Sequence, residues 1–173
     1  PAHNTVVVDG KSDYRNMRGT QAFEVNTIYP IPNNASPQPG HYTFSDVSFL
    51  EPSTDATQRR LTGIVRTSAT SGYFVDIFRS SKKACNDKKH EYIFHGQGEQ
   101  LVLKGANRQM IPTQTTQELS SAHGDLVGYD YFSDKKRVAY SSDFVAQFDM
   151  PSITGKELQV NLWMKGFEGR SLF

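Results

Sequence analysis

The hydrophobic positions of this chain fall in short blocks in which apolar and polar residues alternate. β-Branched and aromatic residues are frequent in these blocks, and clusters of Gly, Pro, Asn, Asp and Ser separate them. Alternation with a period of two, bounded by turn residues, is typical of strands. The pattern therefore predicts roughly nine short strands. After a first short strand at 5–8, they lie in the blocks 23–31, 42–51, 59–68, 72–81, 90–96, 99–105, 126–140, 143–150 and 156–166.

A helical pattern is nearly missing, since residues 115–121 offer the one short candidate. Many short strands with turn signals between them are typical of an all-β fold, and we expect an antiparallel β-sandwich. A length of 173 residues suits a single domain over 1–173. Residues 59–68 and 72–81 predict a hairpin closed by the sequence ATSG.

Both ends of the chain carry strand-like residues. Thr5–Val8 is β-branched throughout and is followed by the turn signal Asp9-Gly10. Its unbroken valines predict burial on both faces. Leu172 and Phe173 follow a turn-like stretch and predict the first residues of another strand. We therefore expect a sandwich that is incomplete at both ends, a fragment of a larger protein, whose open sheet edges favour self-association.

The charges of the chain are almost balanced, with 19 Lys and Arg against 18 Asp and Glu, for a net charge of +1. This balance predicts neither nucleic acid nor a membrane as a partner. No apolar run approaches the ~20 residues that a membrane-spanning helix needs. The single cysteine, Cys85, excludes an internal disulfide and a cysteine-based zinc cluster.

The histidines are the first candidates for chemistry. His3 stands directly before the strand Thr5–Val8, where it is either a hydrogen-bonded structural residue or a metal ligand. The residues alone favour the structural role. His90 and His95 are five apart, so a regular strand places them on opposite faces, where they cannot share one metal. We interpret His95 as a structural histidine in a half-buried strand.

Charged residues suggest two further features. Four lysines surround Cys85, and they indicate a solvated hairpin tip, with binding of a polyanion as the alternative. Asp76 shares a strand face with Phe74 and Phe78, so we expect a structural ion pair, for instance with Arg66 across the hairpin. The sequence from Asn34 to Ser36 matches a glycosylation acceptor. The four lysines are Lys82, Lys83, Lys88 and Lys89.

No Ser/His/Asp motif, phosphate-binding loop or pair of catalytic carboxylates stands out in the sequence. Tyr92, Tyr129 and Tyr131 are candidate bases in principle, but their positions along strands fit packing better. From the residues alone, the chain is an all-β domain that is either part of an enzyme or a non-catalytic carbohydrate-binding or structural domain.

Four stretches of the sequence resemble a known family. "AHNTVVVDGK" at residues 2–11 resembles a motif of the heparinase II/III-like polysaccharide lyases. "GYFVDIFR", "HEYIFHGQG" and "NLWMKGFEGRSLF" are similar to successive parts of that family's C-terminal β-sandwich. The resemblance spans nearly the whole chain, and its first motif is the most specific.

The resemblance implies a protein in which an N-terminal α/α toroid precedes the β-sandwich. Such enzymes cleave acidic polysaccharides that contain uronic acid, for example glycosaminoglycans or alginate, by β-elimination. By resemblance, His3 is one ligand of a zinc ion, whose other ligands, a histidine and an aspartate, lie upstream of this motif. The resemblance also implies a bacterial protein that is periplasmic or secreted, and a chain that is inactive without its toroid.

Overall fold

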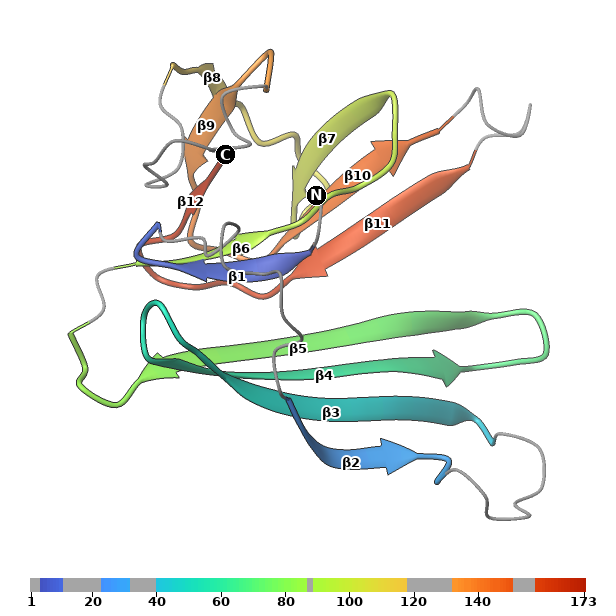
Figure 1. The fold of residues 1–173 in the computed structure, drawn as a ribbon. Coiled ribbons are helices and arrows are strands. Elements are labelled where there is room, and N and C mark those ends of the chain that lie inside the picture. The colour runs from blue at the N-terminus through green and yellow to red at the C-terminus, as the bar shows by residue number, and fades with distance from the viewer. Residues whose placement is uncertain (1–3, 11–22, 32–39, 87–88, 118–131, 151–157) are drawn as a thin grey trace. The chain divides into compact units, whose positions relative to one another are not determined.

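The computed structural model describes residues 4–10, 23–31, 40–86, 89–117, 132–150 and 158–173 (Figure 1). The chain divides into two compact units. We call residues 6–92 the N-terminal unit, and residues 1–5 together with 93–173 the C-terminal unit. The described residues form strands in several antiparallel sheets and contain no helix, which confirms the all-β antiparallel prediction. The prediction of a single domain stays a prediction.

A four-stranded antiparallel sheet dominates the N-terminal unit. It contains β2 (Glu24–Tyr29), β3 (Tyr42–Glu51), β4 (Ala56–Arg66) and β5 (Gly72–Lys82), which are neighbours in this order (Figure 1). The β4–β5 hairpin confirms the predicted pairing around the sequence ATSG.

Two short connections of the N-terminal unit show how local chemistry sets its turns. Glu51 ends β3, and its carboxylate accepts hydrogen bonds from the backbone N–H and hydroxyl of Ser53 and from the hydroxyl of Thr54. Asp9 and Gly10 both have positive φ angles, of 51° and 68°, as expected for the predicted Asp-Gly turn.

The turn at Asp9 follows β1 (Thr5–Val8), which pairs with β6 (His90–Ile93). Of the valines in β1, Val8 is 1% exposed, whereas Val6 and Val7 are half-buried. The predicted burial on both faces is therefore wrong for the first part of this strand. A two-stranded sheet offers few neighbours to cover both of its faces.

The C-terminal unit contains two three-stranded sheets. One consists of β11 (Gln159–Met164), β10 (Phe144–Asp149) and β7 (Gln100–Gly105), with β10 in the centre. The other consists of β12 (Ser171–Leu172), β9 (Lys136–Ala139) and β8 (Gln114–Thr115), with β9 in the centre. β12 confirms the strand predicted at the end of the sequence.

The core of the C-terminal unit forms around β10, whose alternation points Phe144 and Ala146 to one side. These two residues and Ile111 are buried. Phe144 contacts Tyr140 edge to face, with ring centroids 6.5 Å apart, and the guanidinium of Arg170 lies 4.7 Å from the Phe144 ring centroid. Partly buried side chains complete the cluster, namely Leu103, Val138, Tyr140, Phe148, Leu162, Met164 and Leu172.

Arg170 also fixes the loops beside this core. Its guanidinium donates hydrogen bonds to the carbonyl oxygens of Tyr140, Ser142 and Lys165, at distances of 3.1, 2.5 and 2.6 Å. Burial lowers the pKa of Arg170 from its ordinary value. Three backbone acceptors offset the loss of water around this cation.

Several sequence predictions differ from the structure at their boundaries. The block 90–96 forms a strand only as far as Ile93. Further on, a Cβ added to Gly96 would lie 2.3 Å from Cε1 of Phe148, so this glycine permits a close approach of that ring. In the block 126–140, the described residues 132–140 form a strand at Lys136–Ala139, and residues 126–131 lie outside the described residues.

The short helical candidate at 115–121 forms no helix where it is described, because Thr115 lies in β8 and the two following residues are not helical. The rest of that block, residues 118–121, lies outside the described residues. None of the described residues forms a helix that is long and apolar enough to cross a membrane.

Candidate functional site

The N-terminal unit contains a cluster of three polar side chains centred on Asp76 in β5. Arg60 in β4 donates to this carboxylate from Nε at 2.9 Å and from Nη2 at 2.7 Å, so the pair is bidentate. The hydroxyl of Tyr92 in β6 donates to Oδ2 of Asp76 at 3.1 Å. The Arg60 guanidinium also lies 5.2 Å from the ring centroid of Phe78. The cluster therefore joins β6 to the four-stranded sheet.

The electrostatics of the cluster define what Tyr92 can do. Burial raises the pKa of Tyr92, and the charge of Asp76 and its hydrogen bond raise it further, to about 12, although the charge of Arg60 opposes them. A phenol with this pKa keeps its proton at neutral pH, so Tyr92 can donate a proton but is a poor base. This agrees with the prediction that Tyr92 serves packing rather than proton abstraction.

Asp76 confirms the expected ion pair but not the suggested partner. In the register of the hairpin, Asp76 lies opposite Thr62. Arg60 is two residues from Thr62 along β4 and is therefore a diagonal neighbour of Asp76, whereas Arg66 is four residues from Thr62 in the other direction. Diagonal neighbours are about 7–8 Å apart, within reach of a long side chain, whereas Arg66 is four residues along the strand. Arg66 instead donates to the carbonyl oxygen of Ala69 in the hairpin loop.

The structure describes two of the three histidines considered in the sequence, His90 and His95. His3, Tyr129 and Tyr131 lie outside the described residues. His90 is exposed in β6, and His95 is exposed beyond the end of that strand, so the prediction of a half-buried strand histidine is wrong. The strand stops short of His95, which leaves its side chain in solvent.

The residue after His3 has a defined partner. Oδ1 of Asn4 accepts a hydrogen bond from the backbone N–H of His95 at 2.6 Å. Asn4 therefore ties the segment before β1 to the segment after β6, within the C-terminal unit. Among the described residues, no three His, Cys, Asp or Glu side chains converge in a group that could hold a metal ion.

Two lysines of the lysine-rich segment, Lys82 and Lys89, make defined contacts. Nζ of Lys82 lies 3.4 Å from Asp9, whose carboxylate also accepts the backbone N–H of Lys89 at 3.0 Å. Nζ of Lys89 pairs with Glu91 at 2.9 Å. Lys83 is exposed, while Lys88 and the acceptor motif at 34–36 lie outside the described residues. Two of the four lysines thus serve the structure, which leaves less free charge for a polyanion than the sequence suggests.

A second polar network lies on the four-stranded sheet and was missed in the sequence. Asp46 in β3 accepts hydrogen bonds from Nε and Nη2 of Arg59 in β4, at 2.9 and 2.5 Å, and from Nδ2 of Asn26 at 3.2 Å. Ser48 donates to Oδ1 of Asn26 at 3.2 Å. The Asp46 side chain is 6% exposed, whereas that of Arg59 is 48% exposed.

The network has a cationic neighbour. Arg79 lies directly opposite Arg59 in the β4–β5 register and is exposed. The hydrogen bond from Arg59 lowers the pKa of Asp46 most, burial opposes it, and the charge of Arg79 lowers it further. The carboxylate of Asp46 is therefore ionised at neutral pH. It forms an ion pair with Arg59, one of the two adjacent guanidinium groups.

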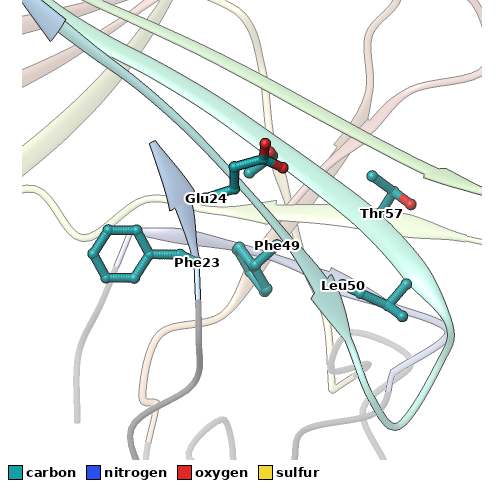
Figure 2. Close-up of a pocket in the computed structure, with 6 residues that line it drawn as sticks. Phe23, Glu24, Phe49, Leu50 and Thr57 are labelled. Carbon is teal, nitrogen blue, oxygen red and sulfur yellow. The ribbon is translucent and has the colours of Figure 1, made fainter. Parts of the chain in front are cut away.

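A shallow hollow adjoins this network where β2 begins and β3 ends. It has a volume of about 390 Å³, and Figure 2 shows Glu24 near Phe49 and Thr57 near Leu50. Leu50 is 59% exposed and Phe23 is 64% exposed, so apolar side chains of this region are accessible to solvent. The lining residues are Phe23, Glu24, Ser48, Phe49, Leu50 and Thr57.

The chain is related to a polysaccharide lyase. The endo-acting ulvan lyase of Formosa agariphila is 28% identical to it over 144 residues. The matched region covers 78% of this chain and 18% of the ulvan lyase, so the chain corresponds to a minor part of that protein. No protein-family model matches the chain. No solved structure gives a significant match.

Proposed function

We propose that the chain is the C-terminal β-sheet portion of a heparinase II/III-like lyase that cleaves a uronic-acid-containing polysaccharide by β-elimination. The observation that carries this proposal is the similarity to an ulvan lyase over 78% of the chain. The family-like stretches at 2–11, 72–79, 90–98 and 161–173 support the same assignment. In this proposal an α/α toroid of the same protein precedes the chain, and the protein acts in the periplasm or outside a bacterial cell.

The proposed lyase carries a zinc ion, and His3 is one of its ligands. When bound, zinc supplies a positive charge that organises the floor of the cleft. Because His3 lies outside the described residues and those residues offer no ligand group, the zinc requires ligands from elsewhere in the protein. The contribution of this chain to the reaction therefore comes from its own side chains.

β-Elimination needs a base for the proton at C5, an acid for the leaving oxygen and a group that neutralises the uronate carboxylate. Tyr92 is protonated and bonded to Asp76, so it does not supply the base. Arg79 is an exposed cation that suits the carboxylate. The described residues thus favour a role in holding the polymer, with proton transfer left to the toroid.

A comparison of the isolated chain with the longer protein that contains it tests this proposal. Both are incubated with ulvan, heparin, heparan sulfate and alginate, and the absorbance of the unsaturated product is followed. We expect product from the longer protein with at least one of these polymers and none from residues 1–173, which should also bind zinc weakly in a parallel titration.

Three outcomes would contradict the proposal. The first is steady product formation by residues 1–173 alone. The second is tight binding of one zinc ion by the isolated chain that His3→Ala abolishes. The third is a folded longer protein that binds these polymers without forming product, which favours the alternative of a non-catalytic carbohydrate-binding domain.

A further inference from the structure

One face of the four-stranded sheet brings aromatic rings and guanidinium groups together. The register places Tyr29 opposite Phe44, and Tyr42 in line with Val65 and Tyr73. It also places Glu24, Ser48, Arg59 and Arg79 in one cross-strand row. Residues directly opposite one another, and residues two apart along a strand, share a face of a sheet. We call this surface the tyrosine–arginine face, and define it by Tyr29, Tyr42, Phe44, Arg59, Tyr73 and Arg79.

The aromatic end of this face is a cluster of accessible rings. The ring centroids of Tyr29 and Tyr42 are 5.2 Å apart, and Phe44 lies 6.2 Å from Tyr29 with an interplanar angle of 18°. Tyr42 is 51% exposed and Tyr73 is 53% exposed. Such rings combine an apolar surface with a polar hydroxyl, which suits ligands that carry both apolar and hydroxylated faces.

The other end of the face carries two guanidinium groups side by side. Arg59 and Arg79 lie directly opposite each other, and Asp46 is the carboxylate that bonds Arg59. Glu24 in β2 lies at the far end of the same row, opposite Ser48, so the charges of the row as a whole balance. Among the described residues, no ion pair or hydrogen bond engages the side chain of Arg79. Like charges directly opposite each other destabilise a sheet, so an anion bound to Arg79 would relieve its repulsion with Arg59.

The two ends lie close enough for one extended ligand. Phe44 and Ser48 mark the aromatic and cationic rows on β3, and they are four residues apart, or roughly 13 Å along the strand. A flat arrangement of rings followed by guanidinium groups fits a chain of sugar rings that bears carboxylate or sulfate groups. Guanidinium binds both of these anions through paired hydrogen bonds.

We propose that the tyrosine–arginine face binds an acidic polysaccharide, with sugar rings on the tyrosines and a carboxylate or sulfate on Arg79. The choice of a polysaccharide rests on the proposed function, whereas the choice of an acidic one rests on the exposed guanidinium of Arg79, which lies directly opposite Arg59. Arg79 thereby becomes a residue that sets specificity for charged over neutral polymers.

Affinity electrophoresis of residues 1–173 in gels that contain ulvan, alginate or neutral dextran tests this inference. Arg79→Ala removes the exposed guanidinium and Tyr42→Ala removes an exposed ring. Arg66→Ala is the matched control for charge, because Arg66 is exposed in the same hairpin but lies on the opposite face of β4. Trp163→Ala is the control for an exposed aromatic residue, since Trp163 is 78% exposed in the C-terminal unit.

We expect ulvan and alginate, but not dextran, to retard the wild-type chain. Arg79→Ala should weaken binding of the acidic polymers roughly ten-fold or more, because one charge-assisted contact is lost. Added salt should weaken the wild type more than Arg79→Ala. Tyr42→Ala should weaken binding at every salt concentration, and both controls should bind like the wild type. Arg79→Lys should recover part of the affinity, because it restores the charge without the fork of donors.

The inference is overturned if Arg79→Ala binds the acidic polymers like the wild type, if Arg66→Ala loses as much affinity, or if dextran binds equally well. It is also overturned if sedimentation shows a dimer of the chain that Arg79→Ala dissociates, because a second copy then covers the face. These results are independent of the proposed lyase activity. If the longer protein binds the polymers at this face but forms no product, only the proposed lyase activity is refuted. If it forms product without binding at this face, only the proposed binding role of the tyrosine–arginine face is refuted.

Discussion

Phe144→Ala should destabilise the C-terminal unit by about 3–5 kcal/mol, the usual cost of truncating a buried phenylalanine. Phe144 is 6% exposed in the centre of the core and contacts both Tyr140 and Arg170. Ile111 and Ala146 are buried with it, and partly buried side chains pack around these three residues, so removing the ring leaves a cavity inside a packed cluster. A loss of this size is a large share of the total stability of a domain.

Urea unfolding followed by circular dichroism measures this effect. Phe167→Ala is the matched control, because Phe167 is in the same unit and is 72% exposed. It should change the free energy of unfolding by no more than about 0.5 kcal/mol. A Phe144→Ala protein that unfolds at the same urea concentration as Phe167→Ala would show that the core is not centred on β10.

Asp76→Ala should destabilise the N-terminal unit by about 1–2 kcal/mol, because it leaves Arg60 and Tyr92 without their shared acceptor. This expected loss of stability is smaller than for a fully buried ion pair, because the side chains of Arg60 and Asp76 are each 28% exposed. Asp55→Ala, at an exposed position, is unsuitable as a control because Asp55 has a positive φ angle of 59°. Glu24→Ala, on an exposed residue of the same unit, serves instead, and an equal loss in both variants would contradict the role of the cluster.

The same cluster predicts a pH dependence with a definite sign. The pKa of Tyr92 is about 12 in the folded chain and near 10 when unfolded, so its protonated form is favoured by folding. Its contribution is complete below about pH 10 and is lost as the pH rises towards 12. The stability of the wild type should therefore fall relative to Tyr92→Phe between pH 8 and pH 11. A constant difference over this range would contradict the placement of Tyr92 against Asp76.

The strands of this chain could be predicted from its sequence because alternation and turn chemistry are local. The Asp-Gly turn after β1, the β4–β5 hairpin and the short β12 follow from neighbouring residues. β8 was missed because two residues, Gln114 and Thr115, carry no periodic signal. Its pairing with β9 depends on a contact distant in sequence.

The candidate sites depend on the register, that is, on the alignment of neighbouring strands, which cannot be read from the sequence. Alternation correctly placed Asp76 on a face with Phe74 and Phe78, but the choice between Arg60 and Arg66 required the alignment of two strands. The tyrosine–arginine face required the alignment of four strands, including an irregularity between Val25 and Thr27 in β2. Buried polar atoms such as Oε1 of Gln58 and Oγ of Ser80, which have no partner among the described residues, were equally beyond sequence patterns.

Steady-state kinetics of the longer protein on ulvan, with and without Arg79→Ala, separate polysaccharide binding by this chain from elimination by residues elsewhere in the protein. We expect Arg79→Ala to raise KM roughly ten-fold and to leave kcat within about two-fold, because binding is then lost equally from the ground state and the transition state. A folded wild-type protein that forms no unsaturated product, or a variant whose kcat falls about a hundred-fold at unchanged KM, would contradict this division of roles.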